Sequence, residues 1–141
     1  MSDDGEVAAP RALVVFGGQA DLAWLKMLKR GYRHCFVVVE AESSIWILYN
    51  PLSHCTELGA VTGVEGAAVA GHYRGLGYCV VETYLTNPIK RSAPWRPYTC
   101  VEAVKRVLGL RARRVFTPWQ LYQFLVSKNN GINSLTLGNN S

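Results

Sequence analysis

The sequence has no apolar run approaching the ~20 residues that a membrane-spanning helix needs, so we expect no membrane span. Its opening residues, MSDDGEVAAPR, are acidic and polar, without the basic start and the apolar stretch of a secretory signal peptide. We therefore expect a protein that is not secreted through a signal peptide and that stays in the cytoplasm.

Charged residues are also scarce. Only 18% of the 141 residues are charged and 49% are hydrophobic, a composition that excludes a disordered chain and a coiled coil and fits one globular domain. The net charge of +5 includes Arg106, Arg111, Arg113 and Arg114, a cluster compatible with a nucleic-acid surface. We favour a solvated helix end, because Lys105 and Arg106 lie in the last turn of a predicted helix, where cations suit the dipole.

The motifs of common cofactor and redox sites are missing. The glycine-rich segment GGQADL lacks the G-x-G-x-x-G spacing of a dinucleotide-binding turn. No C-x-x-C pair occurs among Cys35, Cys55, Cys79 and Cys100. We therefore predict no cofactor, and we expect free thiols rather than disulfides.

Ligands for a metal ion are few. His54 and Cys55 are adjacent, and adjacent side chains of an extended chain point in different directions. A zinc site would need two further ligands from His72, Cys79 or a carboxylate. We therefore predict that the protein holds no metal.

Strand and helix patterns predict a small α+β domain. Apolar, β-branched composition indicates strands over 12–16, 34–40, 45–50 and 78–85. A short helix is expected over 21–28, after a glycine turn. The alternation of strand and helix patterns places all of these segments in one domain.

Polar and proline-rich segments set the predicted boundaries. Residues 52–77 are weakly patterned, so we expect a loop with at most a short strand or helical turn, and the prolines of 87–97 predict an extended connector. We place the domain at 11–126. A flexible arm at 1–10 and a mobile Asn/Ser/Gly-rich tail at 127–141 flank it. Both ends are candidates for contacts in a homo- or hetero-oligomeric assembly.

The clearest hairpin lies between residues 34 and 50. If its turn centres on Glu42, then Glu40 faces Ser44 and His34 faces Asn50 across the ladder. The runs VVV and IWIL blur the alternation of apolar and polar residues. This predicts a sheet with both faces covered.

Two helices begin with capping boxes. Thr117 and Gln120, with Pro118 at the first helical position, predict a helix that ends near Val126. The other capping box consists of Thr99 and Glu102.

Thr99 and Glu102 occupy the N-cap and N3 positions of a helix that ends at Gly109, which puts Cys100 at N1. Unpaired backbone N–H groups and the positive end of the helix dipole stabilise a thiolate at this position. The expected architecture is therefore a small antiparallel sheet packed against a helix that begins with Cys100.

A cysteine nucleophile also needs a base and a group that orients the base. His34 starts a strand, and the predicted register places Asn50 opposite it. We predict that Cys100 is the nucleophile, His34 the general base and acid, and Asn50 the residue that orients the imidazole. The competing interpretation is structural: a small buried cysteine and a histidine that only makes a hydrogen bond.

Two further residues are candidates for the surroundings of this site. Gln19, in the glycine turn, is a possible donor to an oxyanion. Trp95, in the proline connector just before Cys100, is placed to border a cleft. Trp46 and Trp119 fall on predicted apolar faces and are expected to pack in the core.

The order of these residues resembles the papain-like superfamily, specifically its circularly permuted, NlpC-type branch, in which the histidine strand precedes the cysteine helix. The resemblance covers roughly residues 31–110: the strand with His34, the strand ending at Asn50, a further strand, and the helix from Cys100. It implies a papain-like fold and a cysteine hydrolase or acyltransferase acting on an amide or ester bond. The N-C-E-H-F signature of the lecithin:retinol acyltransferase-like proteins is absent, because TCVE stands in its place.

The segments RHCF, NP and TCVEAVKRVLGL also resemble small uncharacterised proteins encoded in phage and prophage genomes. This resemblance implies a viral or prophage setting, without implying an activity. It motivates an alternative from another class, a non-catalytic structural component of a phage virion or other large assembly. The protein would then be virion-associated rather than cytoplasmic.

Overall fold

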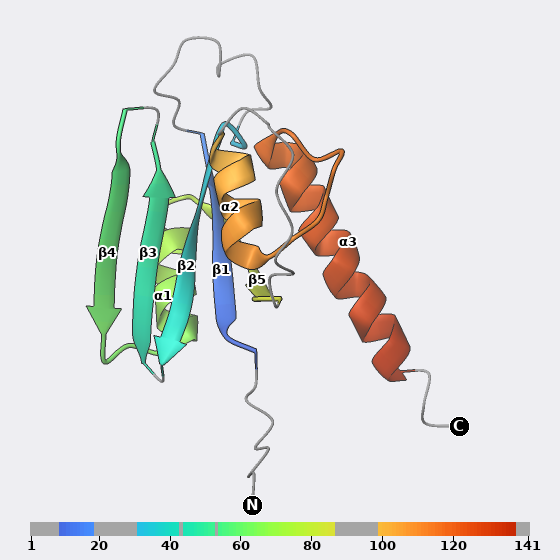
Figure 1. Ribbon diagram of the computed structural model, residues 1–141. Helices are drawn as coiled ribbons and strands as arrows, with labels where there is room; N and C mark the ends of the chain where they lie inside the picture. Colours follow the sequence, from blue (N-terminus) through green and yellow to red (C-terminus); the bar gives the residue numbers. More distant parts are fainter. Residues whose placement is uncertain (1–8, 19–30, 43, 53, 87–98, 138–141) are drawn as a thin grey trace, which may run out of the picture.

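Figure 1 shows the computed structural model of the chain. The residues it describes are 9–18, 31–42, 44–52, 54–86 and 99–137, with side chains described as far as Ile132. The helix predicted over 21–28 and the connector predicted over 87–97 lie outside the described residues, as does the arm before Ala9.

The described chain forms an α+β fold around one antiparallel sheet of five strands. The spatial order of the strands is β4-β3-β2-β1-β5. Their bounds are β1 Arg11–Gly17, β2 His34–Glu42, β3 Ile45–Pro51, β4 Thr56–Thr62 and β5 Cys79–Tyr84. The strands predicted over 12–16, 34–40, 45–50 and 78–85 are thereby confirmed, with ends displaced by one or two residues.

Helices cover both faces of the sheet, as the VVV and IWIL runs predicted. Helix α1 (Gly66–Gly75) packs on one face, and helices α2 (Cys100–Leu108) and α3 (Pro118–Leu137) pack on the other (Figure 1). Successive residues of β1 alternate between the two cores: Leu13 belongs to the α1 side and Val14 to the α2 side. Both are buried, so β1 reads as a continuous apolar run.

The predicted register of the hairpin is wrong by two residues. Glu40 pairs with Trp46 instead of Ser44, and the ladder continues to Glu42 through an irregularity between Glu40 and Glu42. Ser44 has a positive φ of 64°, and the turn lies between Glu42 and Ile45, later in the chain than the turn centred on Glu42 that the sequence suggested. A shift of two residues keeps every side chain on its predicted face, because side chains of a strand alternate with a period of two.

The prediction of a loop over 52–77 is also wrong, since this segment contains β4 and α1. β4 is an edge strand with mostly exposed residues, so it lacks an apolar pattern. α1 begins close to the sheet, because a Cβ at Gly66 would come 2.7 Å from the Trp46 ring. Its Val69 and Ala70 fill the rest of the contact.

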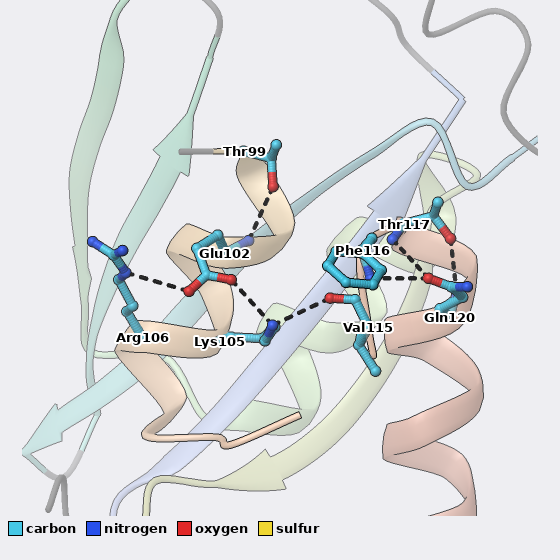
Figure 2. Close-up of polar contacts among 8 residues, drawn as sticks. All are labelled: Thr99, Glu102, Lys105, Arg106, Val115, Phe116, Thr117 and Gln120. Atoms are coloured by element: carbon cyan, nitrogen blue, oxygen red, sulfur yellow. Dashed lines mark hydrogen bonds and ion pairs between the residues drawn. The ribbon is translucent and has the colours of Figure 1, made fainter. Parts of the chain in front are cut away.

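The N-cap hydrogen bond is confirmed at both helix starts (Figure 2), but the reciprocal side-chain bond of a capping box is described only at Thr117, because the Glu102 carboxylate contacts Lys105 and Arg106. Thr99 Oγ1 accepts a hydrogen bond from the backbone N–H of Glu102 at 3.2 Å, and α2 ends at Gly109 with a left-handed φ of 70°. At α3, Thr117 Oγ1 accepts from the N–H of Gln120, whose side chain accepts from the N–H of Thr117, each at 3.2 Å. Cys100 is therefore at N1 of α2.

Helix α3 runs past its predicted end at Val126 as far as Leu137. Asn129 contributes to this extension, because its side-chain Nδ2 donates to the backbone carbonyl of Glu82 in β5 at 2.9 Å. The composition of this segment favoured a mobile tail, whereas a tertiary hydrogen bond ties its first residues to the sheet. No helix among the described residues is long and apolar enough to cross a membrane.

Candidate active site

The candidate site lies where the first turn of α2 meets the start of β2 (Figure 1). Cys100 is partly buried against the core on this side of the sheet. Cys35, the second residue of β2, is fully buried in the same core. The start of α2 at Cys100 therefore places this side chain against the core that includes Cys35 of β2.

His34 interacts with both other members of the predicted triad. Its side chain is hydrogen-bonded to the Cys100 side chain. Its Nε2 lies 2.7 Å from Asn50 Oδ1. The structure thus brings the side chains of Cys100, His34 and Asn50 together, with His34 between the other two.

The contact between His34 and Asn50 forms despite the wrong register. The ladder pairs Val37 with Tyr49 and Val38 with Leu48, so Asn50 lies two residues from the position opposite His34. Diagonal neighbours on the same face of a sheet remain within reach of long side chains. An error of one residue would have put the amide on the other face.

Glu57 fixes the direction of the Asn50 amide. Asn50 Nδ2 donates to Glu57 Oε2 at 2.9 Å, and the two residues are paired across β3 and β4. A carboxylate only accepts hydrogen bonds, so Oδ1 must face His34, and Nε2 must then carry the hydrogen that Oδ1 accepts. The ring nitrogen that remains for the Cys100 sulfur is Nδ1.

Three contacts lower the pKa of Cys100 to about 5. The largest effect is a hydrogen bond from the Cys35 thiol, and burial opposes it. The His34 side chain and the backbone N–H of Cys35 add further stabilisation of the thiolate. Burial, with the hydrogen bond and charge of Cys100, raises the pKa of Cys35 well above its usual range. At neutral pH, Cys100 is therefore a thiolate and Cys35 is a protonated thiol.

Sequence reasoning missed two residues of this arrangement. Cys35 follows His34 directly, and strand alternation turns it toward the helix that carries Cys100. That signal was present once α2 was expected to pack on this strand. Glu57 was out of reach, because the segment that contains it was predicted to be loop.

The remaining candidates do not join the site as described. Gln19 and Trp95 lie outside the described residues. His54 and Cys55 are exposed. Within the part of the chain that the structure describes, no three His, Cys, Asp or Glu side chains are grouped so that they could hold a metal ion.

The basic end of α2 differs from the solvated surface that we expected. Lys105 is buried, with a relative exposure of 4%, and its Nζ donates to Glu102 Oε2 at 3.1 Å and to the Val115 carbonyl at 3.2 Å. Arg106 Nε lies 3.5 Å from the other oxygen of the same carboxylate (Figure 2). Arg113 is exposed, as the solvated interpretation predicted. Lys105 is therefore structural.

A cavity of about 600 Å³ lies at the opposite end of the sheet, between the start of β1, the end of β5 and α3. Arg11, Tyr84 and Lys128 are among its lining residues, and none of the residues of the Cys100 site lines it. Shape alone would favour this cavity as a binding site, whereas Cys100 and its partners lie elsewhere.

Comparison of the chain with protein-family models, with curated proteins and with solved structures found no match.

Proposed function

We propose that this protein is a papain-like cysteine hydrolase or acyltransferase that acts on an amide or ester bond. The observation that carries the proposal is the connected set Cys100, His34 and Asn50, with the nucleophile at a helix N-terminus. Two features support the permuted papain-like resemblance. The histidine strand precedes the cysteine helix in the chain, and the described strands form an antiparallel sheet. The phage or prophage setting rests on the sequence resemblance alone.

The proposed reaction begins when the Cys100 thiolate adds to the substrate carbonyl. His34, protonated as the thiolate's counter-ion, gives its proton to the leaving amine or alcohol, and an acyl-thioester on Cys100 results. His34 then takes a proton from water or from an acceptor alcohol or amine, which attacks the thioester and releases the acyl group. Asn50 holds the imidazole in the required orientation.

Acyl transfer to Cys100 should appear as a burst of nitrophenolate when the protein reacts with p-nitrophenyl acetate. We expect an acetyl group on Cys100 by peptide mass mapping, and no burst from Cys100→Ala. His34→Ala should slow the burst by about 100-fold or more, because the general base and acid is lost. Cys55→Ala, which removes an exposed cysteine away from the site, is the matched control and should burst normally. Acetylation of Cys55 with Cys100 untouched would overturn the proposal.

A second candidate is a structural component of an assembly, favoured by the uncovered edge of the sheet. Leu58 on β4 and Ile47 on β3 are 69% and 42% exposed, and they lie on the face that α2 covers elsewhere. Figure 1 shows β3 and β4 extending beyond α2. Exposed apolar side chains beside an open strand edge are typical of a surface that pairs with another chain.

Substitution of Leu58 by lysine tests this second candidate. A lysine on an edge strand blocks pairing, so the variant should shift an assembled protein to monomer in sedimentation velocity. Leu76→Lys, which places the same charge on an exposed apolar residue outside the edge strand, is the matched control and should leave the assembly unchanged. A wild-type protein that stays monomeric at all concentrations would contradict the assembly function.

A further inference from the structure

Cys35 is placed as a partner for Cys100, beyond its effect on ionisation. Its side chain is completely buried beneath α2, with an exposure of 0%, and it belongs to the core against which Cys100 packs. Two interactions join the residues: the Cys35 thiol donates to the Cys100 sulfur, and the backbone N–H of Cys35 donates to the same atom. Both thiols therefore lie on the same side of the sheet, where α2 packs on β2, and each affects the ionisation of the other.

The other two cysteines have no comparable relation to Cys100. Cys79 is half-buried, and its side chain is hydrogen-bonded to Tyr32. Cys55 is exposed beside the start of β4. Among the four thiols of the chain, Cys35 is the one described as interacting with Cys100, and it lies in the core beneath α2.

We propose that Cys100 and Cys35 are a peroxide-reactive redox pair, in which oxidation of Cys100 by a hydroperoxide is followed by a disulfide to Cys35. In the first step the Cys100 thiolate attacks the outer oxygen of ROOH, the O–O bond breaks, and with one proton ROH leaves and a sulfenic acid remains. In the second step the Cys35 sulfur attacks the Cys100 sulfur, and the sulfenic oxygen leaves as water with the Cys35 proton. The hydroperoxide is reduced by two electrons, and the two thiols supply them.

This modification would act on the same sulfur that the proposed function uses as nucleophile, but it does not depend on acyl transfer. A disulfide removes the thiolate and protects it from irreversible oxidation, and a dithiol reductant restores both thiols by exchange. Burial of Cys35 keeps its thiol away from outside oxidants until Cys100 has reacted. The pair therefore provides reversible inactivation of the site.

The test uses the reduced full-length chain, treated with one equivalent of hydrogen peroxide and then alkylated with N-ethylmaleimide in denaturant. We expect two of the four thiols to escape alkylation, with a Cys35–Cys100 peptide in the mass map that a dithiol reductant removes. The Cys55→Ala/Cys79→Ala variant, which leaves only the pair, should give the same link. Four alkylated thiols, or a disulfide that involves Cys55 or Cys79, would overturn the proposal.

Cys35→Ala provides the complementary measurement. Without its partner, the sulfenic acid at Cys100 should persist long enough to be trapped by dimedone, whereas the wild-type chain should give little adduct. Circular dichroism establishes whether this core variant folds; if it does not, the mass map of the wild-type chain still decides. If the reduced chain gives no nitrophenyl ester burst but peroxide forms the Cys35–Cys100 disulfide, the proposed function is overturned and the redox pair stands. If the burst occurs and the disulfide does not form, only the redox pair is overturned.

Discussion

Alkylation of Cys100 by iodoacetamide is expected to reach about nine-tenths of its plateau rate at pH 6, because a pKa of about 5 leaves the sulfur almost fully ionised there. An ordinary thiol with a pKa of ~8.5 reaches under one hundredth of its plateau at that pH. The rate should fall only as the pH drops through 5, when the Cys100 thiolate takes up a proton. Initial rates from pH 4 to 9, resolved by peptide mapping, measure this profile.

Two variants separate the causes of the low pKa. Cys35→Ala and His34→Ala should each move the midpoint of the Cys100 profile upward, because both side chains lower the pKa of Cys100. Cys79→Ala is the matched control, since it removes another cysteine of the same core and should leave the midpoint unchanged. A wild-type midpoint near that of a free thiol would show that the first turn of α2 has only a structural role.

Substitution of Glu102 by alanine is expected to lower the free energy of unfolding by about 3 kcal/mol, because it leaves a buried charge without its counter-ion. The Lys105 side chain is 5% exposed and its ammonium group contacts Glu102 Oε2 at 3.1 Å. After the substitution, the Val115 carbonyl is the one remaining partner described for Nζ, and it carries no charge. Urea denaturation followed by circular dichroism measures the change.

Arg106 offers a matched control on the same carboxylate. Its side chain is 46% exposed, so Arg106→Ala should cost less than about 1 kcal/mol, as surface ion pairs do. The double variant Glu102→Gln/Lys105→Met should recover most of the stability, because it replaces the buried charge by an apolar side chain of similar length. Equal losses from Glu102→Ala and Arg106→Ala would contradict the structural role of Lys105.

Features of the sequence that act locally gave reliable predictions. The N-cap bonds of Thr99 and Thr117 form within four residues, so the starts of both helices were predicted correctly. The strands of the hairpin were also found, but their register depends on the irregularity at Glu40 to Glu42 and on the positive φ of Ser44. Neither of these has a clear signature in composition.

The parts that escaped prediction depend on tertiary contacts. The edge position of β4 removes the apolar pattern by which strands are recognised, and with it the means of finding Glu57. The glycines and alanines of α1 suggested a loop, although the first of them, Gly66, reflects close approach to Trp46. For the site, chain order and the capping box predicted Cys100, His34 and Asn50, while the hydrogen bond from Cys35 required knowledge of where α2 packs.

The position of β1 in the sheet has a consequence for the order of folding. Strands β2, β3 and β4 are consecutive neighbours, whereas β1 also pairs with β5, so that Arg11 lies opposite Tyr84. Loop-closure entropy makes such distant pairing slow, and α2 follows β5 in the chain. We therefore expect the β2–β4 meander to form first during synthesis, with Cys35 uncovered on the nascent chain until α2 follows and packs over it.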